Sequence, residues 1–423
     1  MISIRKLRKN KEIYKNAILK RGDEFDFENI LHMDSKIRQM KTSANDMRAE
    51  RNTASEAIGI ARKAGEDAEE AIIKTRKLGE NLKELESQLQ ILEENLNRIL
   101  HQIPNPPHSS VPHGFNESEN IEVRTWGDKV EFDFEPKTHL ELGDNLKLFD
   151  FKSASKLSGS GFPLYIGKGA KLERKLINSM IDFHVEKYGF KEVFPPVLML
   201  KDSMITTGQL PKFQEDMYHT EVDNLFLAPT AEVPVTNIHR NDILEEADLP
   251  IYYVAYSPCF RRESGSYGKD TRGLLRVHQF NKVELVKFTT PSSSYEELET
   301  LTSQAESILR KLGLHYRVVS LCAGDLSFSA AKCYDLEIWA PGEKKWLEVS
   351  SCSNFESFQA RRGNIRYRKN IDKKVELLHT LNGSGVATPR LMIALLETYQ
   401  TENGNVLFPK EVANFLGMDQ ISC

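Results

Sequence analysis

The most regular pattern in the sequence is a heptad repeat of small and apolar residues over residues 68–99. Their spacings alternate between three and four, which places them on one stripe of an α-helix. A weaker stripe covers residues 30–61, with Arg51 as its polar member. Between the stripes, Gly65 can end a helix and Asp67 can cap the next one. The pattern predicts an antiparallel helical hairpin over about residues 28–100, roughly 45 Å long at ~1.5 Å per residue.

Alanines replace leucines in both stripes toward the predicted turn. Small side chains bury less apolar area, so we expect a less stable and mobile tip. Basic residues outside the stripes are typical of a solvated coiled-coil surface, and contact with the phosphates of a nucleic acid is the alternative. These basic residues are Lys36, Arg38, Lys41, Arg48, Arg62, Lys63, Lys74, Arg76 and Lys77.

A proline-rich segment follows the predicted hairpin. Four prolines fall within residues 104–112, and proline cannot continue a helix. A chain of 423 residues is also too long for one compact core. We therefore expect an N-terminal domain over residues 1–103, a linker over residues 104–115 and a second domain over residues 116–423.

In the second domain, short apolar or aromatic runs alternate with helical patterns. Residues 171–187 have the pattern of an amphipathic helix, and a strand ending at Pro195 follows. Several predicted strands follow one another without helices between, which favours an antiparallel sheet flanked by helices over a βαβ series. The expected fold class is therefore α+β. The further strands are predicted over residues 251–257, 277–288, 316–321, 334–339 and 346–351.

Composition excludes several classes of protein. With 40% apolar residues, 28% charged residues and a net charge of −4, the chain has no overall basic field for nucleic acid. No stretch approaches the ~20 apolar residues that span a bilayer, and no signal peptide is evident, so no membrane partner is expected. Five widely spaced cysteines form no Cys-x-x-Cys pair, so no zinc is expected, and reduced thiols fit a cytoplasmic protein.

Charged residues repeat at every second position within residues 258–284. Arg261 and Glu263 share one face of an extended chain, which suits pairing with phosphates beside an aromatic ring that stacks on a base. An exposed hairpin with salt bridges is the alternative. The chain has no Gly-x-x-x-x-Gly-Lys-Ser/Thr loop, so any ATP must bind in another way. The predicted return strand repeats the pattern with Arg276, His278, Phe280, Lys282 and Glu284.

Polar groups also mark the ends of other predicted elements. Glu348 and the serines after it could hold magnesium through oxygen ligands. Thr230 and Glu232 could hold an ammonium group, although such a tripeptide is more often a helix N-cap. Thr388 and the proline after it suit the cap and first turn of a helix, which would place Arg390 at the helix start.

These segments together resemble the class II aminoacyl-tRNA synthetases and, within that class, the seryl-tRNA synthetase family. The helix and strand that end at Pro195 resemble class II motif 1, the Phe260-Arg-x-Glu hairpin resembles motif 2, and residues 385–397 resemble motif 3. The resemblance covers the whole chain, including the hairpin, which in this family reaches the long variable arm of serine tRNA. The serine-specific signature lies in residues 207–213, 230–232, 270–280, 348–354, 358–362 and 381–385.

The resemblance implies a role for each matching residue. Arg261 and Arg390 would be catalytic and hold the α- and γ-phosphates of ATP, and Phe280 would stack on adenine. Glu348 and Ser351 would hold magnesium. The implied ATP-binding set is Arg261, Arg262, Glu263, Phe280, Glu348, Val349, Ser350, Ser351 and Arg390. The implied L-serine-binding set is Thr230, Ala231, Glu232, Glu284 and Ser384.

The activity implied is that of a serine–tRNA ligase, which forms seryl-adenylate from L-serine and ATP and transfers the seryl group to the 3′ end of tRNA(Ser). A homodimer is implied in the same way, and the charging of tRNA(Sec) is left open. Two positions depart from the family pattern: Tyr267 in the motif 2 loop and Thr388 before the motif 3 arginine. A carrier-protein ligase without tRNA charging and an inactive RNA-binding scaffold are the alternative functions.

Overall fold

The computed structural model describes residues 1–264 and 272–422, and the chain forms two compact units. One comprises Met1–Leu19 and Asp23–Pro104, and the other comprises Lys20–Gly22 and Asn105–Cys423. Across the described ranges, no helix combines the length and the apolar character that a bilayer crossing needs.

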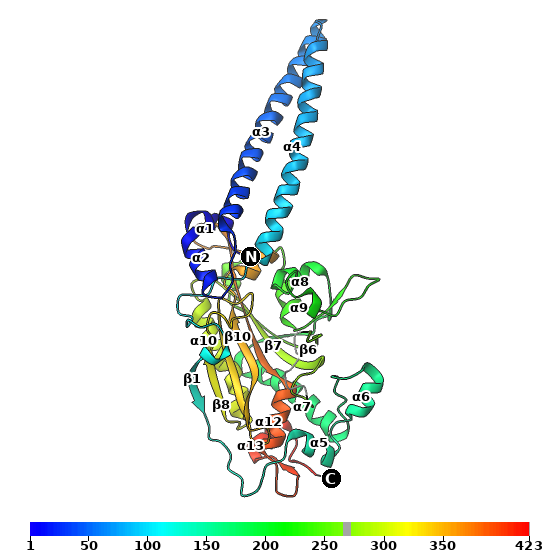
Figure 1. Cartoon of the computed structure of the whole chain (residues 1–423), viewed down its shortest axis with the longest axis vertical. Helices are drawn as coiled ribbons and strands as arrows, with labels where there is room; N and C mark the ends of the chain where they lie inside the picture. Colours follow the sequence, from blue (N-terminus) through cyan, green and yellow to red (C-terminus); the bar gives the residue numbers. More distant parts are fainter. Residues whose placement is uncertain (265–271, 423) are drawn as a thin grey trace. The chain divides into compact units, whose positions relative to one another are not determined.

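The first unit is built on a long helical hairpin. Helices α3 (Phe27–Ala64) and α4 (Glu69–Gln102) lie side by side and antiparallel (Figure 1). Two short helices, α1 (Ile4–Lys9) and α2 (Lys11–Leu19), precede them. The predicted hairpin is confirmed, and Gly65 ends α3 in the left-handed conformation at φ 80°. Ala68 occupies the N-cap position of α4, and the Asp67 carboxylate caps the helix from one residue earlier by accepting from the Glu69 backbone N–H at 3.0 Å.

Burial along the hairpin follows the two predicted stripes. Ile30, Ile37, Leu89 and Leu96 are buried in one core near the base of the hairpin. No residue of 45–81, all of them described, is buried. The alanines of this stretch bury little area, which agrees physically with a weakly held tip.

One buried position in the hairpin is charged. Asp34 is 6% exposed, and its carboxylate pairs with Arg8 and Arg38 at 3.2 Å each. Other basic residues pair across the two helices, with Lys41 to Glu93 at 2.5 Å and Arg48 to Glu86 at 2.6 Å. These latter pairs are exposed and stabilise little.

The second unit is organised around an eight-stranded sheet in the order β1-β8-β9-β10-β13-β7-β6-β2. All neighbouring strands are antiparallel except β2 and β6, so the prediction of an antiparallel sheet is confirmed. The strands are β1 (Ile121–Trp126), β2 (Lys191–Val193), β6 (Ile251–Phe260), β7 (Gln279–Thr289), β8 (Tyr316–Ser320), β9 (Lys332–Ala340), β10 (Lys345–Asn354) and β13 (His379–Ala387).

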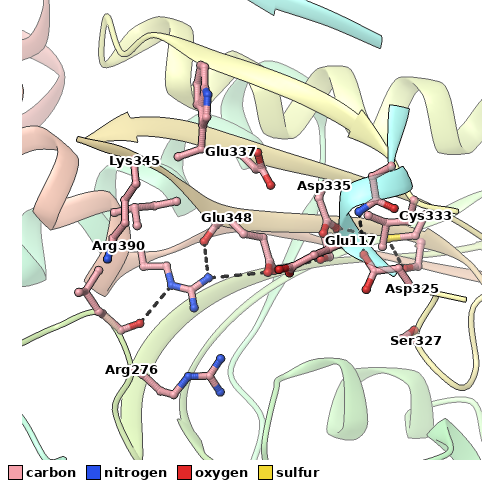
Figure 2. A pocket seen from close by; sticks show the side chains of 17 residues that line it. Glu117, Arg276, Asp325, Ser327, Cys333, Asp335, Glu337, Lys345, Glu348 and Arg390 are labelled. Atoms are coloured by element: carbon pink, nitrogen blue, oxygen red, sulfur yellow. Dashed lines mark hydrogen bonds and ion pairs between the residues drawn. The ribbon is translucent and has the colours of Figure 1, made fainter. Parts of the chain in front are cut away.

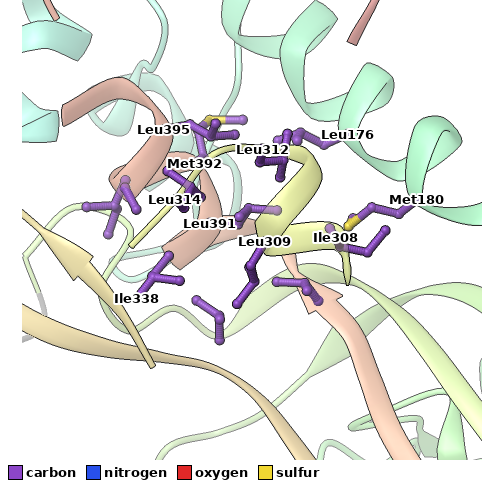
Figure 3. Close-up of a cluster of buried hydrophobic side chains, with 14 of the residues drawn as sticks. Leu176, Met180, Ile308, Leu309, Leu312, Leu314, Ile338, Leu391, Met392 and Leu395 are labelled. Atoms are coloured by element: carbon purple, nitrogen blue, oxygen red, sulfur yellow. The ribbon is translucent and has the colours of Figure 1, made fainter. Parts of the chain in front are cut away.

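Helices cover one face of this sheet and form the main core. Leu176 and Met180 of one helix, Ile308 of a second and Leu391 of a third meet above the sheet residue Ile338 (Figure 3). The helices concerned are α5 (His139–Leu146), α7 (Gly167–Tyr188), α10 (Ser294–Lys311), α12 (Thr388–Thr398) and α13 (Lys410–Leu416). The remaining helices are α6 (Phe151–Ser158), α8 (Lys201–Thr207), α9 (Glu232–Asn237) and α11 (Phe358–Gly363).

Strand β7 shows how the sheet separates core from site. Val283 and Leu285 belong to the core under the helices. Phe280 and Lys282, at the alternate positions, line a cavity instead. Because successive side chains of a strand point to opposite faces, Lys282 and Glu284 are turned away from the helical layer, whereas Lys287 faces it and pairs with Glu297 of α10.

Seven short strands complete the unit. A three-stranded sheet has the order β12-β11-β5, and β3 pairs with β4 and β14 with β15. These strands are β3 (Leu198–Met199), β4 (Phe226–Leu227), β5 (Ile243–Glu245), β11 (Arg366–Arg368), β12 (Val375–Leu377), β14 (Val406–Leu407) and β15 (Gln420–Ile421).

Candidate active site

A cavity of about 420 Å³ brings most of the predicted site residues together. They come from the start of α9 and the residues before it, from the ends of β6 and β7, from β10 and β13, and from the start of α12. The predicted residues that line the cavity are Thr230, Glu232, Arg261, Glu263, Phe280, Glu348, Val349, Ser350, Ser351, Ser384 and Arg390.

Three predicted residues do not line the cavity. Arg262 is exposed, and its backbone N–H donates to the Asp216 carbonyl at 3.1 Å. Ala231 is fully buried. Glu284 is also fully buried, but it touches the lining residue Thr230, whose hydroxyl donates to its carboxylate at 3.1 Å. Glu284 can therefore affect the cavity through its neighbours.

Arg261 follows directly after β6 and faces an aromatic ring. Its guanidinium carbon lies 5.2 Å from the centre of the Phe280 ring, and its Nε donates to the Pro229 carbonyl at 3.4 Å. Glu263 has a φ of 52° and pairs with Arg276, another lining residue. The segment thus presents a cation beside a ring and an ion pair to the same cavity, an arrangement that suits a base and its phosphates.

His278 does not share the face that strand alternation predicts. Strand β7 begins only at Gln279, so residue 278 lies outside the regular pleat. Its Nδ1 lies 3.1 Å from the Arg261 carbonyl oxygen, and its ring lies 5.3 Å from that of Phe162. That part of the prediction is wrong. Tyr267 lies outside the described residues.

Arg390 is held at the start of α12 by backbone carbonyls. Its Nη1 donates to the Glu348 carbonyl at 2.8 Å and its Nε to the Leu275 carbonyl at 3.2 Å (Figure 2). The Glu348 carboxylate lies 3.7 Å from the same Nη1. Thr388 is not the cap that the sequence predicts: Ala387 is the N-cap, and the Thr388 hydroxyl donates to the Glu173 carboxylate at 2.5 Å.

A second cavity of about 520 Å³ adjoins the first and shares Arg276, Glu348, Ser351 and Arg390 with it. Figure 2 shows Glu348 beside Arg390, with Asp335, Glu117 and Asp325 at the other end of the cavity. The two cavities together are large enough for an extended polyphosphate and its counter-ions. The acidic lining residues of the second cavity are Glu117, Asp325, Asp335, Glu337 and Glu348.

A bulge in β10 brings Glu348 and Ser351 to the same face. Glu348 pairs with Glu337, and Ser350 pairs with Leu336. Two steps along β10 thus match one step along β9, and the register shifts between these pairs. The Ser351 hydroxyl lies 2.6 Å from an Asp335 oxygen and 3.2 Å from a Glu348 oxygen. Burial, together with the charge of Glu348, raises the pKa of Asp335 well above its ordinary value. This oxygen-only donor set fits a hard divalent cation such as magnesium.

Two buried carboxylates lie at the inner end of the cavity. One Asn382 Nδ2 donates to Glu232 and to Glu284, at 3.0 Å each. Gln359 donates to the other Glu232 oxygen at 2.6 Å, and the Lys282 ammonium pairs with Glu284 at 2.5 Å. Burial, followed by the charge of Glu284, raises the pKa of Glu232 to about 7. This group of acceptors suits a small polar molecule that carries an ammonium group.

The sequence prediction assigned no role to several residues of this site. Asn382 lies two residues before Ser384 on the same strand, so the two side chains point to the same face. This spacing is the sequence signal that could have predicted the place of Asn382 in the site. Gln359 lies within the quoted signature, whereas Asp335 has no local signal because only the pairing of β9 with β10 brings it there. Val277 also lines the cavity.

A histidine and two glutamates also gather away from the cavity. The ligand atoms of His139, Glu343 and Glu397 lie within 4.8 Å of one another. His139 Nε2 accepts from the Leu274 backbone N–H at 3.2 Å, so its hydrogen belongs on Nδ1, which lies 3.2 Å and 3.5 Å from the two carboxylates. This arrangement is a buried hydrogen-bond network, in which neither ring nitrogen is left to bind a metal.

Comparison with known proteins agrees with this geometry. The model of the tRNA synthetase class II core domain (G, H, P, S and T) matches residues 213–399, which include much of the sheet and most of the site. This fold and site therefore define a class II aminoacyl-tRNA synthetase core. The model of the seryl-tRNA synthetase N-terminal domain matches residues 1–107.

Relatives of known sequence and structure narrow the class to one family. The serine–tRNA ligase of Acetivibrio thermocellus is 54% identical over 417 residues, which cover 99% of each chain. Seryl-tRNA synthetase from Pyrococcus horikoshii complexed with ATP superposes with a TM-score of 0.92 at 38% identity, covering 100% of this chain and 99% of that one. The cytoplasmic serine–tRNA ligase of Naegleria fowleri in complex with AMP gives 0.84 at 28% identity, covering 98% and 96%. The chain belongs to the seryl-tRNA synthetase family.

Proposed function

We propose that this chain is an ATP-dependent serine–tRNA ligase. It joins L-serine to ATP as seryl-adenylate with release of pyrophosphate, and then transfers the seryl group to the 3′-terminal ribose of tRNA(Ser). One observation carries the proposal: a single cavity is lined by a buried carboxylate, Glu232, and buried hydroxyls, and also by the arginines Arg261, Arg276 and Arg390. An amino acid and a triphosphate are the two substrates that such a cavity accommodates together.

In the proposed serine complex, the amino acid is surrounded by the side chains of Thr230, Glu232, Glu284 and Ser384. The backbone of Ala231 lies between Thr230 and Glu232 in sequence. The carboxylates attract the ammonium group of serine and accept from its hydroxyl. A site that hydrogen-bonds a hydroxyl rejects the analogue that lacks it, because its buried polar groups are then left unpaired. Alanine should therefore be rejected by a factor on the order of 10⁴.

In the proposed ATP complex, Phe280 stacks on adenine, Glu263 reads its edge beside Arg262, and Val349 and Ser350 line the nucleotide site. Arg261 holds the α-phosphate, and Arg390 holds the γ-phosphate. Glu348 and Ser351 would hold magnesium, which supplies positive charge to the phosphate oxygens.

The residues act mainly by alignment in the first reaction step. The serine carboxylate is already a nucleophile, so no side chain needs to remove a proton from it. Its oxygen attacks the α-phosphorus and pyrophosphate leaves, while Arg261 neutralises charge on the phosphorus centre and Arg390 neutralises the leaving group. Both arginines are fixed by backbone carbonyls, at 3.4 Å for Arg261 and at 2.8 and 3.2 Å for Arg390, so little reorganisation is required.

The hairpin of the first unit is the proposed binding element for tRNA. Near its tip, Arg62, Lys63, Lys74 and Lys77 have no ion pair within the described residues, which leaves their charges available for phosphates. This is the family's use of the hairpin, and it replaces the interpretation as a merely solvated surface. The cytoplasm, where tRNA and ATP are found, is the proposed location.

The proposed assembly is a homodimer formed around motif 1. The apolar side chains of Phe194, Leu198 and Leu200, which follow the motif 1 strand, are exposed by 78%, 48% and 58%. Large apolar side chains that gather on a surface are typical of an interface. Sedimentation equilibrium should give twice the mass of one chain, and a mass of one chain would exclude the dimer.

The first step is tested by ATP–pyrophosphate exchange with each of the twenty amino acids. Serine alone should support rapid exchange. Exchange with another amino acid, or none with serine, would contradict the proposal. Exchange with serine but no charging of any tRNA would instead favour a carrier-protein ligase.

A further inference from the structure

A short segment between the first helices belongs to the unit that carries the active site. Lys20–Gly22 lies between α2 and α3 in sequence, yet it groups with Asn105–Cys423. Its central residue, Arg21, is the reason. Nη1 donates to the carbonyls of Asn105 and Ala330 at 3.2 Å each. Nη2 donates to the carbonyls of Leu326 and Ser327 at 2.7 and 2.8 Å.

The carbonyls that Arg21 contacts belong to a wall of the active-site cavity. Ser327, Phe328 and Ser329 line the cavity that also contains Thr230 and Glu232. Ser327 lines the neighbouring cavity as well, where Figure 2 shows it. Three residues of this segment thus form part of the cavity lining, and we call residues 326–330 the wall segment.

The wall segment is irregular and lies between β8 and β9. Besides local hydrogen bonds, its carbonyls are paired by the linker and by Arg21. Asn105 donates from its backbone N–H to the Phe328 carbonyl and from Nδ2 to the Ser329 carbonyl, both at 2.9 Å. The His108 backbone N–H donates to the Ala331 carbonyl at 2.8 Å. Four successive carbonyls of the wall segment, 326–329, therefore take their partners from residues far away in sequence.

The ring of Phe328 extends this support to the substrate side. It lies 6.1 Å from the Phe213 ring and 5.7 Å from the Phe358 ring, edge to face in both cases. Phe213 lines the same cavity, as do Gly208 and Gln209 of the same segment. A shift of the wall segment would therefore change the shape of the cavity on the side where Glu232 lies.

We propose that Arg21 is a positioning residue for amino-acid activation, which sets the wall segment around the serine-binding end of the cavity through its bonds to the carbonyls of residues 326, 327 and 330. The inference rests on the proposed function for the identity of the substrate. It gives the N-terminal part of the chain a role in the first reaction step, separate from any contact with tRNA. Guanidinium suits this position because its planar, forked donors can reach four carbonyls at once, which an ammonium group cannot do.

The test compares Arg21→Ala, Arg21→Lys and Lys20→Ala in the full chain, with serine-dependent ATP–pyrophosphate exchange in the absence of tRNA. Lys20 is the matched control, because it is exposed and adjacent to Arg21. Arg21→Ala should raise the KM for serine at least tenfold with a smaller change in kcat, and Arg21→Lys should give an intermediate KM. Lys20→Ala should match the wild type.

Active-site titration in the same samples measures the fraction of folded enzyme. A merely structural role would lower that fraction and leave KM unchanged, which would overturn the proposal. A serine KM for Arg21→Ala within twofold of wild type would overturn it as well. If Arg21→Ala does not fold, Arg21→Lys decides by the same criterion, and failure of both to fold assigns Arg21 to folding and ends the proposal. Wild-type exchange with serine tests the proposed function separately.

Discussion

A single side-chain nitrogen of Asn382 donates to two buried carboxylates, Glu232 and Glu284, at 3.0 Å each. Two negative charges at this spacing repel one another, and the shared donor offsets part of that repulsion. Asn382 lies on β13, Glu284 on β7 and Glu232 at the start of α9, so the bridge joins three elements that are far apart in sequence. The bridge therefore ties these three elements together at the proposed serine end of the cavity.

Removal of the bridge should weaken serine binding. Asn382→Ala leaves both carboxylates without the shared donor, at a cost of about 2 kcal/mol, which corresponds to roughly a thirtyfold higher KM for serine. Pyrophosphate exchange at varied serine concentration measures this KM. Asn370→Ala, at an exposed asparagine of the same unit, is the control and should not differ from wild type. A serine KM unchanged in Asn382→Ala would show that the bridge does not shape the site.

The affinity for serine should depend on pH through Glu232. Its pKa is raised to about 7, so the carboxylate is mostly protonated at pH 6 and mostly ionised at pH 8 in the free enzyme. The ammonium group of serine favours the ionised form, and the KM for serine should therefore fall about tenfold from pH 6 to pH 8. Glu232→Gln should bind serine weakly and without this slope. A wild-type KM that is flat across this range would exclude the assignment.

The buried residue Glu173 allows a test of how folding stability depends on pH, at a position with no role in the proposed reaction. Burial raises its pKa from 4.5 to about 7, against hydrogen bonds from Thr388 and Asn281 that lower it. The folded state thus binds a proton more tightly than the unfolded state does. The stability linked to this proton is fully present below pH 4.5 and is lost as the pH rises through 7. The loss amounts to roughly 3 kcal/mol by pH 8.

Glu173→Gln should remove this pH dependence, because the amide stays neutral and can still accept from Thr388. Urea unfolding of the wild type and of the variant at pH 5 and pH 8 measures how much the free energy of unfolding changes with pH in each. Glu186→Gln, at an exposed position of the same helix α7, should unfold with the pH profile of the wild type. Parallel profiles for wild type and Glu173→Gln would refute the buried titration.

Arg390 should act in adenylate formation and not in tRNA binding. Arg390→Ala removes the cation that lies against Glu348 at the start of α12, and the exchange rate should fall by a factor on the order of 10² to 10³. Affinity for tRNA, measured by filter binding, should change less than twofold. The exposed Lys311→Ala of α10 serves as the control. Equal losses of exchange and of tRNA affinity would mean that the substitution damages the fold.

The helical hairpin should be dispensable for serine activation. Removal of residues 31–100 keeps Arg21 and the cavity, so serine-dependent exchange should persist while tRNA charging is abolished. The measurement is the ratio of the two rates in the shortened chain and in the full chain. Undiminished charging without residues 31–100 would refute the role given to the hairpin.

The hairpin was predictable because its signal is local. The stripes on α3 and α4 repeat every seven residues, and Gly65 marks the turn between them. Most residues that the family signature singled out line the cavity, since each motif is a short run of sequence, and their roles stay predictions. Thr388 was misassigned because a threonine before a proline resembles a cap in sequence, whereas its hydroxyl donates to Glu173 of another helix.

The remaining features depend on pairing between distant strands. The bulge in β10 sets Glu348 and Ser351 on one face although strict alternation separates them. His278 turns away because β7 begins after it. Arg21 shows no pattern in its own segment, and its four carbonyl partners lie between 84 and 309 residues away. Sequence periodicity contains no information on such contacts.

The most direct test of the account is charging of a tRNA(Ser) transcript by the purified chain with ATP and radiolabelled serine. We predict acid-precipitable seryl-tRNA that forms only with serine, ATP and this tRNA together, and that is lost in Arg390→Ala. A purified, folded chain that binds tRNA(Ser) but forms neither seryl-adenylate nor seryl-tRNA would contradict the account.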